Sequence, residues 1–175
     1  MKTKHLILLL FFCSLLLNSK CKKEKTEPQL PPETTIGAMT FGCKIDGKVF
    51  VPKGSNAGPD ISAQYLFLGT GPGGGWWLNL SAANREEAKG VYIRTDTLLL
   101  LEGNSYVLKK QKGFPSAEHS NGLFDYLITN NDTGNLVVTK HDQTQRILSG
   151  RFSFTASRST GEKVTITKGR FDIRY

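Results

Sequence analysis

The glycine-rich stretch GTGPGGGWW, residues 69–77, contains the spacing G-x-G-x-x-G at Gly69, Gly71 and Gly74. In dinucleotide-binding proteins these glycines follow a strand and open a helix, whose N-terminal N–H groups bind pyrophosphate. Here the residues that follow the glycines are WWLNLSA. Their apolar and polar side chains alternate with period two, which predicts a strand and not a helix. A strand directs its N–H groups sideways into the sheet. We therefore predict a flexible connection between two strands and no nucleotide cofactor.

The same alternation singles out Trp77 and Asn79 as a candidate ligand surface. Trp77 shares its face with Asn79 and Ser81, while Trp76 lies on the other face. A tryptophan beside a glycine-rich loop can stack on a sugar or an aromatic ligand. The alternative is that both faces of this strand are covered, and the pattern favours it because the neighbouring run at 64–68 is apolar on both faces.

Residues that catalyse reactions or bind metals show no recognisable spacing. His119 and His141 stand alone among polar residues, so we interpret both as surface groups and predict no metal site. The chain contains neither G-x-S-x-G nor a Walker loop. Asp125, Asp142 and Asp172 could converge in the fold as the carboxyl pair of a glycosidase, a possibility that spacing alone leaves open. No catalytic residue is assigned.

The N-terminus has the layout of an export signal. Two lysines precede an apolar run from Leu6 to Leu17, which is about 18 Å long as a helix and too short to span a bilayer core of roughly 30 Å. The run ends shortly before Cys21, and KKEKTEPQLPPE follows. This arrangement resembles a bacterial lipoprotein, in which the cysteine is acylated and the polar segment is a tether. Lys20 departs from the small residue usual at that position, and an ordinary secreted protein is the alternative.

The cysteine content argues against a disulfide, and the charge distribution argues against nucleic-acid binding. After removal of residues 1–20, the only cysteines left are Cys21 and Cys43, and alternation in FGCKI places Cys43 on an apolar face, so we predict a buried core thiol and no disulfide. Of the 23 lysines and arginines, three lie in residues 1–20, which leaves 20 bases against 15 acids. The bases are scattered and do not interleave with aromatic residues, so nucleic-acid binding is not expected.

From residue 36 onward the chain reads as short β-branched and aromatic runs separated by turn residues, the pattern of an antiparallel all-β domain. We predict about ten strands, in the runs 40–45, 48–52, 64–68, 76–82, 91–95, 105–109, 123–129, 136–140, 147–157 and 163–175. Two segments, around Glu86 and near Thr97, are candidates for single helical turns. No segment is long enough to form a helical layer.

Three local features make the strand assignment specific. Asp46-Gly47 predicts a type I′ hairpin, because both central residues of that turn need positive φ. Residues 130–134 are turn formers and predict a hairpin loop between the runs at 123–129 and 136–140. The apolar face of the last run changes parity between Ile166 and Phe171, so a β-bulge is expected at Gly169.

The two ends of the domain, TFGCKIDGKVFVPKG (40–54) and ILSGRFSFTASRSTGEKVTITKGRFDIRY (147–175), resemble small lipoproteins of Bacteroidota that form a family of unknown function. In that family a hydrophobic-x-Asp/Asn-Gly-Lys-aromatic hairpin opens the domain and a Ser-Gly-x-Phe-x-Phe hairpin closes it. The resemblance implies an all-β, lipid-anchored envelope protein, in the outer membrane. It carries no activity, catalytic residue or cofactor.

The sequence thus predicts a signal peptide at 1–20, an acylated Cys21 with a polar tether over 21–35, and one antiparallel sandwich or flattened barrel over 36–175. The preferred function is non-enzymatic binding of a glycan, a small apolar molecule or an envelope protein, with Trp77 and Asn79 as the candidate surface. The alternative is an envelope hydrolase whose carboxylates converge only in the fold.

Overall fold

The structure is a computed structural model that describes residues 28–54 and 60–175. These residues form eleven strands, and none of them is helical. The strands are β1 (Thr40–Ile45), β2 (Lys48–Phe50), β3 (Ile61–Phe67), β4 (Trp76–Asn84), β5 (Lys89–Arg94), β6 (Ser105–Val107), β7 (Ser116–Ser120), β8 (Asp125–Leu127), β9 (Gly134–Asp142), β10 (Ile147–Ser157) and β11 (Lys163–Arg174). The all-β prediction is confirmed.

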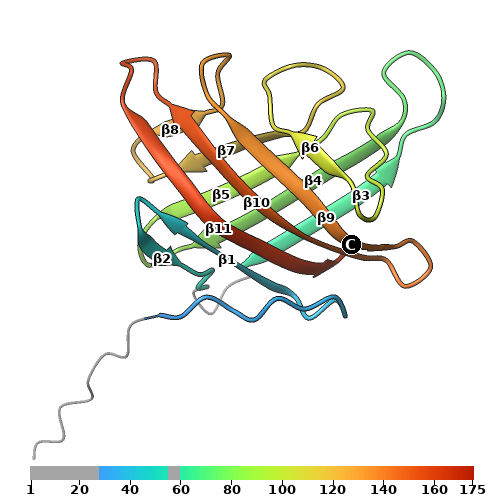
Figure 1. Cartoon of the computed structure of the whole chain (residues 1–175), viewed down its shortest axis with the longest axis horizontal. Helices are drawn as coiled ribbons and strands as arrows, with labels where there is room; N and C mark the ends of the chain where they lie inside the picture. Colours follow the sequence, from blue (N-terminus) through green and yellow to red (C-terminus); the bar gives the residue numbers. More distant parts are fainter. Residues whose placement is uncertain (1–27, 55–59) are drawn as a thin grey trace, which may run out of the picture.

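The strands form one antiparallel sheet that does not close on itself. Its path runs β2-β1-β11-β10-β8-β7-β5-β4-β3, and β9 and β6 extend from β10 as a branch. The sheet folds over into two layers whose strands cross, with β9, β10, β11 and β1 in one layer and β3, β4, β5 and β7 in the other (Figure 1). This is the flattened barrel or sandwich that the alternation predicts.

The layers meet at β10, because this strand pairs with two different neighbours along one edge. Residues 147–154 pair with β9, whereas Ser157 pairs with Leu127 of β8. The chain between β8 and β9 crosses this branch point, and Thr155 donates its backbone N–H to the carbonyl of Thr133 there. A prediction is therefore wrong: residues 130–134 do not join a hairpin, since β8 and β9 pair with β10 and not with each other.

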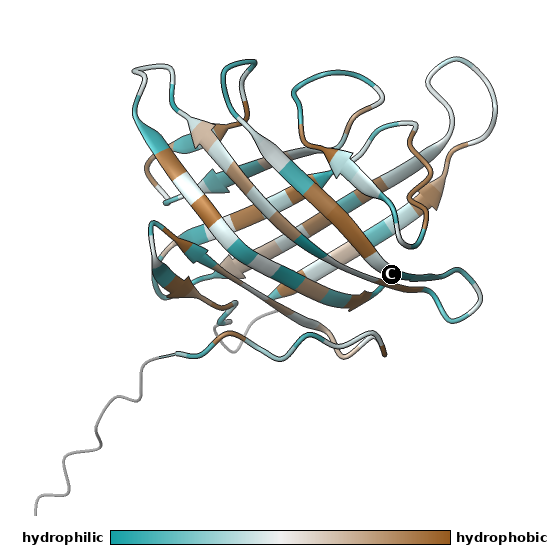
Figure 2. Ribbon diagram, viewed as in Figure 1, coloured by the Kyte–Doolittle hydropathy of each residue, from teal (hydrophilic) through white to brown (hydrophobic). Residues whose placement is uncertain are grey.

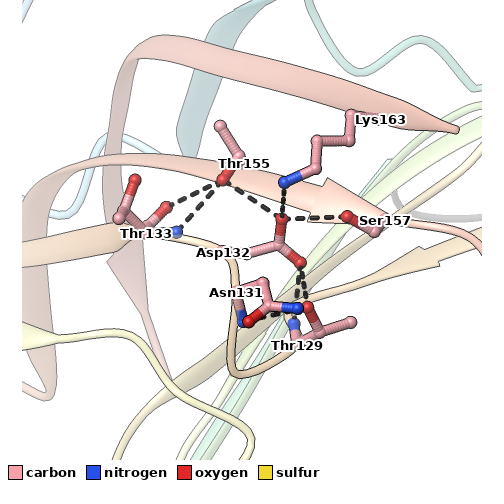
Figure 3. A network of polar contacts seen from close by, with 7 residues as sticks. All are labelled: Thr129, Asn131, Asp132, Thr133, Thr155, Ser157 and Lys163. Carbon is pink, nitrogen blue, oxygen red and sulfur yellow. Dashed lines mark hydrogen bonds and ion pairs between the residues drawn. The ribbon is translucent and has the colours of Figure 1, made fainter. Parts of the chain in front are cut away.

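A single carboxylate, Asp132, holds this branch point together (Figure 3). Its side chain is fully buried and accepts hydrogen bonds from the backbone N–H and hydroxyl of Thr129, at 2.9 and 2.7 Å. On the other side it accepts from Ser157 of β10 at 2.9 Å and from Lys163 of β11 at 3.2 Å. Burial alone would raise the pKa of Asp132, but these donors outweigh it and lower the pKa to about 2.

Between the layers lies one hydrophobic core, to which most strands contribute alternate residues (Figure 2). Phe152 packs on Phe41 and Phe171, and Trp76 stacks on Tyr65 with ring centroids 4.9 Å apart. Cys43 is completely buried, as predicted, and burial raises the pKa of its thiol to about 12. The thiol is therefore a packing group rather than a nucleophile.

The chain before β1 is bound to the sheet by a second buried carboxylate. Asp172 of β11 accepts hydrogen bonds from the Thr34 hydroxyl, from Ser149 and from the backbone N–H groups of residues 36–38, at 2.7–3.0 Å. Burial opposes ionisation here too, yet the donors lower the pKa of Asp172 to about 2. Farther upstream Glu33 forms an ion pair with Arg151. Residues 33–35, assigned from sequence to the tether, thus lie against the domain.

Two of the local predictions are confirmed. Asp46 and Gly47 both have positive φ, 47° and 83°, in the turn between β1 and β2. The bulge in β11 is also present, because the register with β10 shifts between Gly169 and Ile166. Lys168, not Gly169, takes the positive φ of 52°. Gly169 is needed instead for space, since a Cβ there would lie 2.5 Å from the ring of Phe152.

Two other features differ from the predictions. The segments around Glu86 and Thr97 contain no helix: the first is the turn between β4 and β5, and the second is an irregular connection anchored by Leu98 N–H to the carbonyl of Trp76. Strand β7, SAEHS, was not predicted, because its inward residues are a small alanine and a histidine and give no apolar alternation.

We expect Asp132→Asn to lower the free energy of unfolding by about 2–4 kcal/mol, because an amide nitrogen would face donors where an oxygen accepts. The control is Asp125→Asn, an exposed carboxylate on β8, which should change the stability little. Chemical denaturation measures both. Since the folded pKa is below the ordinary 3.8, wild-type stability should fall between about pH 4 and pH 2, and Asp132→Asn should reduce that fall.

Candidate functional site

Four polar side chains form a row across the outer face of the layer that contains β3, β4, β5 and β7. The register pairs Gln64 of β3 with Asn79 of β4, Asn79 with Arg94 of β5, and Arg94 with Ser116 of β7. Residues directly opposite in antiparallel strands point to the same face, with Cβ atoms about 5 Å apart. We call this row the polar ladder. It presents two amides, a guanidinium and a hydroxyl along one line.

Trp77 lies beside the ladder, on the same face as Asn79. It pairs in register with Leu66 of β3 and is partly exposed. The outer face of β4 at Trp77 is therefore partly covered and partly open to solvent. Its indole N–H is enclosed and has no acceptor among the described residues. A buried donor without a partner costs on the order of 1–3 kcal/mol.

The connection between β6 and β7 forms a wall over this face. Asp96 accepts a hydrogen bond from the Gly113 N–H at 3.0 Å, which ties the connection to the end of β5. Phe114 follows and is partly buried, with the Lys109 ammonium 4.8 Å from the centre of its ring. Within the ladder, Arg94 is oriented by Glu118, whose carboxylate lies 2.8 Å from a guanidinium nitrogen.

These groups enclose a cleft of about 440 Å³. Its aromatic sides are Trp77 and Phe114, and its polar sides are the ladder together with Asp96 and Gln111. Sequence reasoning found Trp77 and Asn79, and the structure brings both into this cleft. It missed the remaining residues, because their convergence depends on strand register and on β7.

The glycine-rich loop is the connection between β3 and β4, as predicted. Its backbone N–H groups bind its own carbonyls: Gly75 donates to Gly69 at 2.7 Å and Gly74 to Gly71 at 2.8 Å. Leu68 donates to Gly75 at 2.9 Å. These three N–H groups are therefore engaged within the loop.

The prediction that both histidines lie on the surface is wrong. His119 is 3% exposed, because alternation turns Glu118 and Ser120 outward and His119 inward. His141 is half-buried, and its ring nitrogens lie 2.6 Å from the carbonyl of Leu100 and 3.1 Å from the hydroxyl of Tyr175.

Asp125, Asp142 and Asp172, the three candidates for a catalytic carboxyl pair, have different surroundings. Asp172 is enclosed by hydrogen bonds from its own chain. Asp142 of β9 accepts from the backbone N–H of Gln145 in the turn to β10, and Asp125 of β8 is exposed. In the described part of the chain, no three histidine, cysteine or acidic residues are placed to hold a metal ion.

Comparison with protein-family models, with curated proteins and with solved structures finds no match for this chain. The proposed signal peptide and Cys21 lie outside the described residues. Within the described residues, no helix is long and apolar enough to cross a membrane.

Proposed function

We propose that the protein is a lipid-anchored envelope protein whose cleft at Trp77 binds carbohydrate without chemically altering it. The observation that carries this proposal is the polar ladder, which lies in register across four strands beside a partly exposed tryptophan. A cleft of about 440 Å³ lies within the range of small-molecule sites, roughly 300–1,000 Å³.

Carbohydrate fits this combination better than a purely apolar or charged ligand. A sugar ring has an apolar C–H face, which stacks on an indole, and a rim of hydroxyls that both donate and accept. Gln64 and Asn79 also do both, and Arg94 donates in a planar fork. The indole N–H of Trp77 has no acceptor among the described residues, so this donor remains available within the chain.

Binding is favoured over hydrolysis by the carboxylates of the cleft. A glycosidase normally places two carboxyl groups on either side of the bond that it breaks. Among the described residues that line this cleft, one is acidic, Asp96, and it accepts the Gly113 N–H. The alternative of an envelope hydrolase therefore gains no support at this site.

The lipid anchor rests on the apolar run that ends before Cys21 and on the polar residues beyond it. Residues 28–39 then follow the domain beneath β1 and β11 (Figure 1). Six residues lie between Cys21 and Pro28, and the seven Cα–Cα steps reach at most about 25 Å when extended, so an anchored domain would stay close to the bilayer surface.

We predict that Trp77→Ala weakens carbohydrate binding at least about tenfold, since a central aromatic contact is removed. Isothermal calorimetry with cello-, xylo-, malto- and chito-oligosaccharides measures the Kd on residues 22–175, which include every described residue. Ser81→Ala is the matched control, because Ser81 shares the strand and face of Trp77 but does not line the cleft. Failure of every sugar to bind wild type, or equal affinity of Trp77→Ala, would contradict the proposal.

We also predict that Cys21→Ser moves the protein from the membrane fraction to the soluble fraction of a bacterium that processes lipoproteins. Acyl chains contribute about 0.8 kcal/mol per buried CH₂, and more than one chain is needed for stable anchoring. Cys43→Ser is the control and should leave the protein in the membrane fraction. An unchanged distribution of Cys21→Ser would disprove acylation at this residue.

A further inference from the structure

A second cavity is lined by residues of β1, β2, β5, β7, β8 and β11. Its volume is about 380 Å³. Ile45, Phe50 and Val164 give it an apolar floor, and the two most buried polar groups that line it are His119 and Tyr126. None of these residues lines the cleft at Trp77.

His119 presents a hydrogen-bond acceptor that its own surroundings leave unused. Its Nδ1 lies 2.9 Å from the carbonyl oxygen of Gly90. A carbonyl can only accept, so Nδ1 carries the proton. Burial lowers the pKa of His119, and the bond to Gly90 only partly opposes this, so the ring is neutral at pH 7. Nε2 therefore carries an unprotonated lone pair that can accept a hydrogen bond, and no described residue donates to it.

The ring is also held in place. It stacks on Tyr126 with centroids 5.8 Å apart and planes at 27°. The Tyr126 hydroxyl donates to Glu162 at 2.8 Å, and Glu162 pairs with Arg158 at 2.7 Å. The tyrosine hydroxyl is thus engaged elsewhere, and stacking on Tyr126 together with the Gly90 bond fixes the orientation of the imidazole that carries Nε2.

We propose that this cavity binds a small neutral molecule whose hydroxyl or N–H group donates to Nε2 of His119 while its apolar body packs on Phe50 and Val164. A neutral ligand is favoured because the carboxylates of the rim are engaged within the chain. Asp46 accepts the Thr165 N–H, Glu87 pairs with Lys89, and Glu162 pairs with Arg158. Of the lining lysines, Lys89 and Lys163 are paired with Glu87 and Asp132, and Lys48 is exposed to solvent, where its charge is screened. A neutral imidazole adds no further attraction for an anion.

Phenol and fluorobenzene test this proposal, because they are close in shape and differ in the hydroxyl donor. Both are titrated into ¹⁵N-labelled residues 22–175 while long-range ¹H–¹⁵N spectra follow the histidine nitrogens. We expect phenol to shift Nε2 of His119 saturably and to bind roughly tenfold tighter than fluorobenzene, the difference that one hydrogen bond makes.

The variant His119→Phe keeps the ring and its stacking but removes the acceptor, so it should bind both probes equally. His141→Phe is the control, since His141 is bonded through both nitrogens, and it should retain the preference for phenol. Equal binding of the two probes to wild type would overturn the proposal, and so would a phenol shift at His141 or Trp77 without one at His119. The wild-type comparison decides the matter even if His119→Phe does not fold.

Discussion

The architecture depends on one carboxylate, Asp132, at the point where β10 changes partners. A sheet that folds over into two layers must release one neighbour and accept another along the same strand, which leaves backbone and hydroxyl donors with no strand opposite them. Asp132 accepts from both sides of this gap, from Thr129 before it and from Ser157 and Lys163 across it. Because the Asp132 carboxylate is itself enclosed, its ionised form is stabilised by the several donors that it accepts from, and the pKa of Asp132 is lowered to about 2.

The layer beyond that corner leaves its outer face partly exposed, and this face carries the proposed carbohydrate site. The inner residues of β4 and β5 build the core, so their outer residues are free to be polar, and register aligns them with Gln64 and Ser116. Because neighbouring strands fix the backbone, the ladder is preorganised, and the proposed binding would cost little backbone conformational entropy. The connection between β6 and β7, which carries Phe114, is attached to the end of β5 by the hydrogen bond from Gly113 to Asp96. The polar ladder and this wall are therefore supplied by separate parts of the chain.

Alternation and turn chemistry were sufficient to predict the fold class and most strands, because each of those signals is local. Asp46-Gly47 and the parity change before Phe171 predicted a turn and a bulge that the structure contains. The branch at β10 was not predictable, since the turn formers at 130–134 suit a hairpin and a crossing equally well. The cleft was half predictable: Trp77 and Asn79 follow from alternation, whereas Arg94 and Ser116 join them only through register. His119 was misplaced because its inward neighbour, Ala117, is too small to mark a buried face.

We propose that the outer face at Trp77, and not the cavity at His119, is the carbohydrate surface. Side-chain ¹H–¹⁵N resonances test it most directly, because the Trp77 indole and the amides of Asn79 and Gln64 each give separate signals. When the oligosaccharide panel is added to labelled residues 22–175, the account predicts saturable shifts at these three side chains, with the His119 nitrogens unchanged. Shifts that centre on His119, or on residues of neither site, would contradict it.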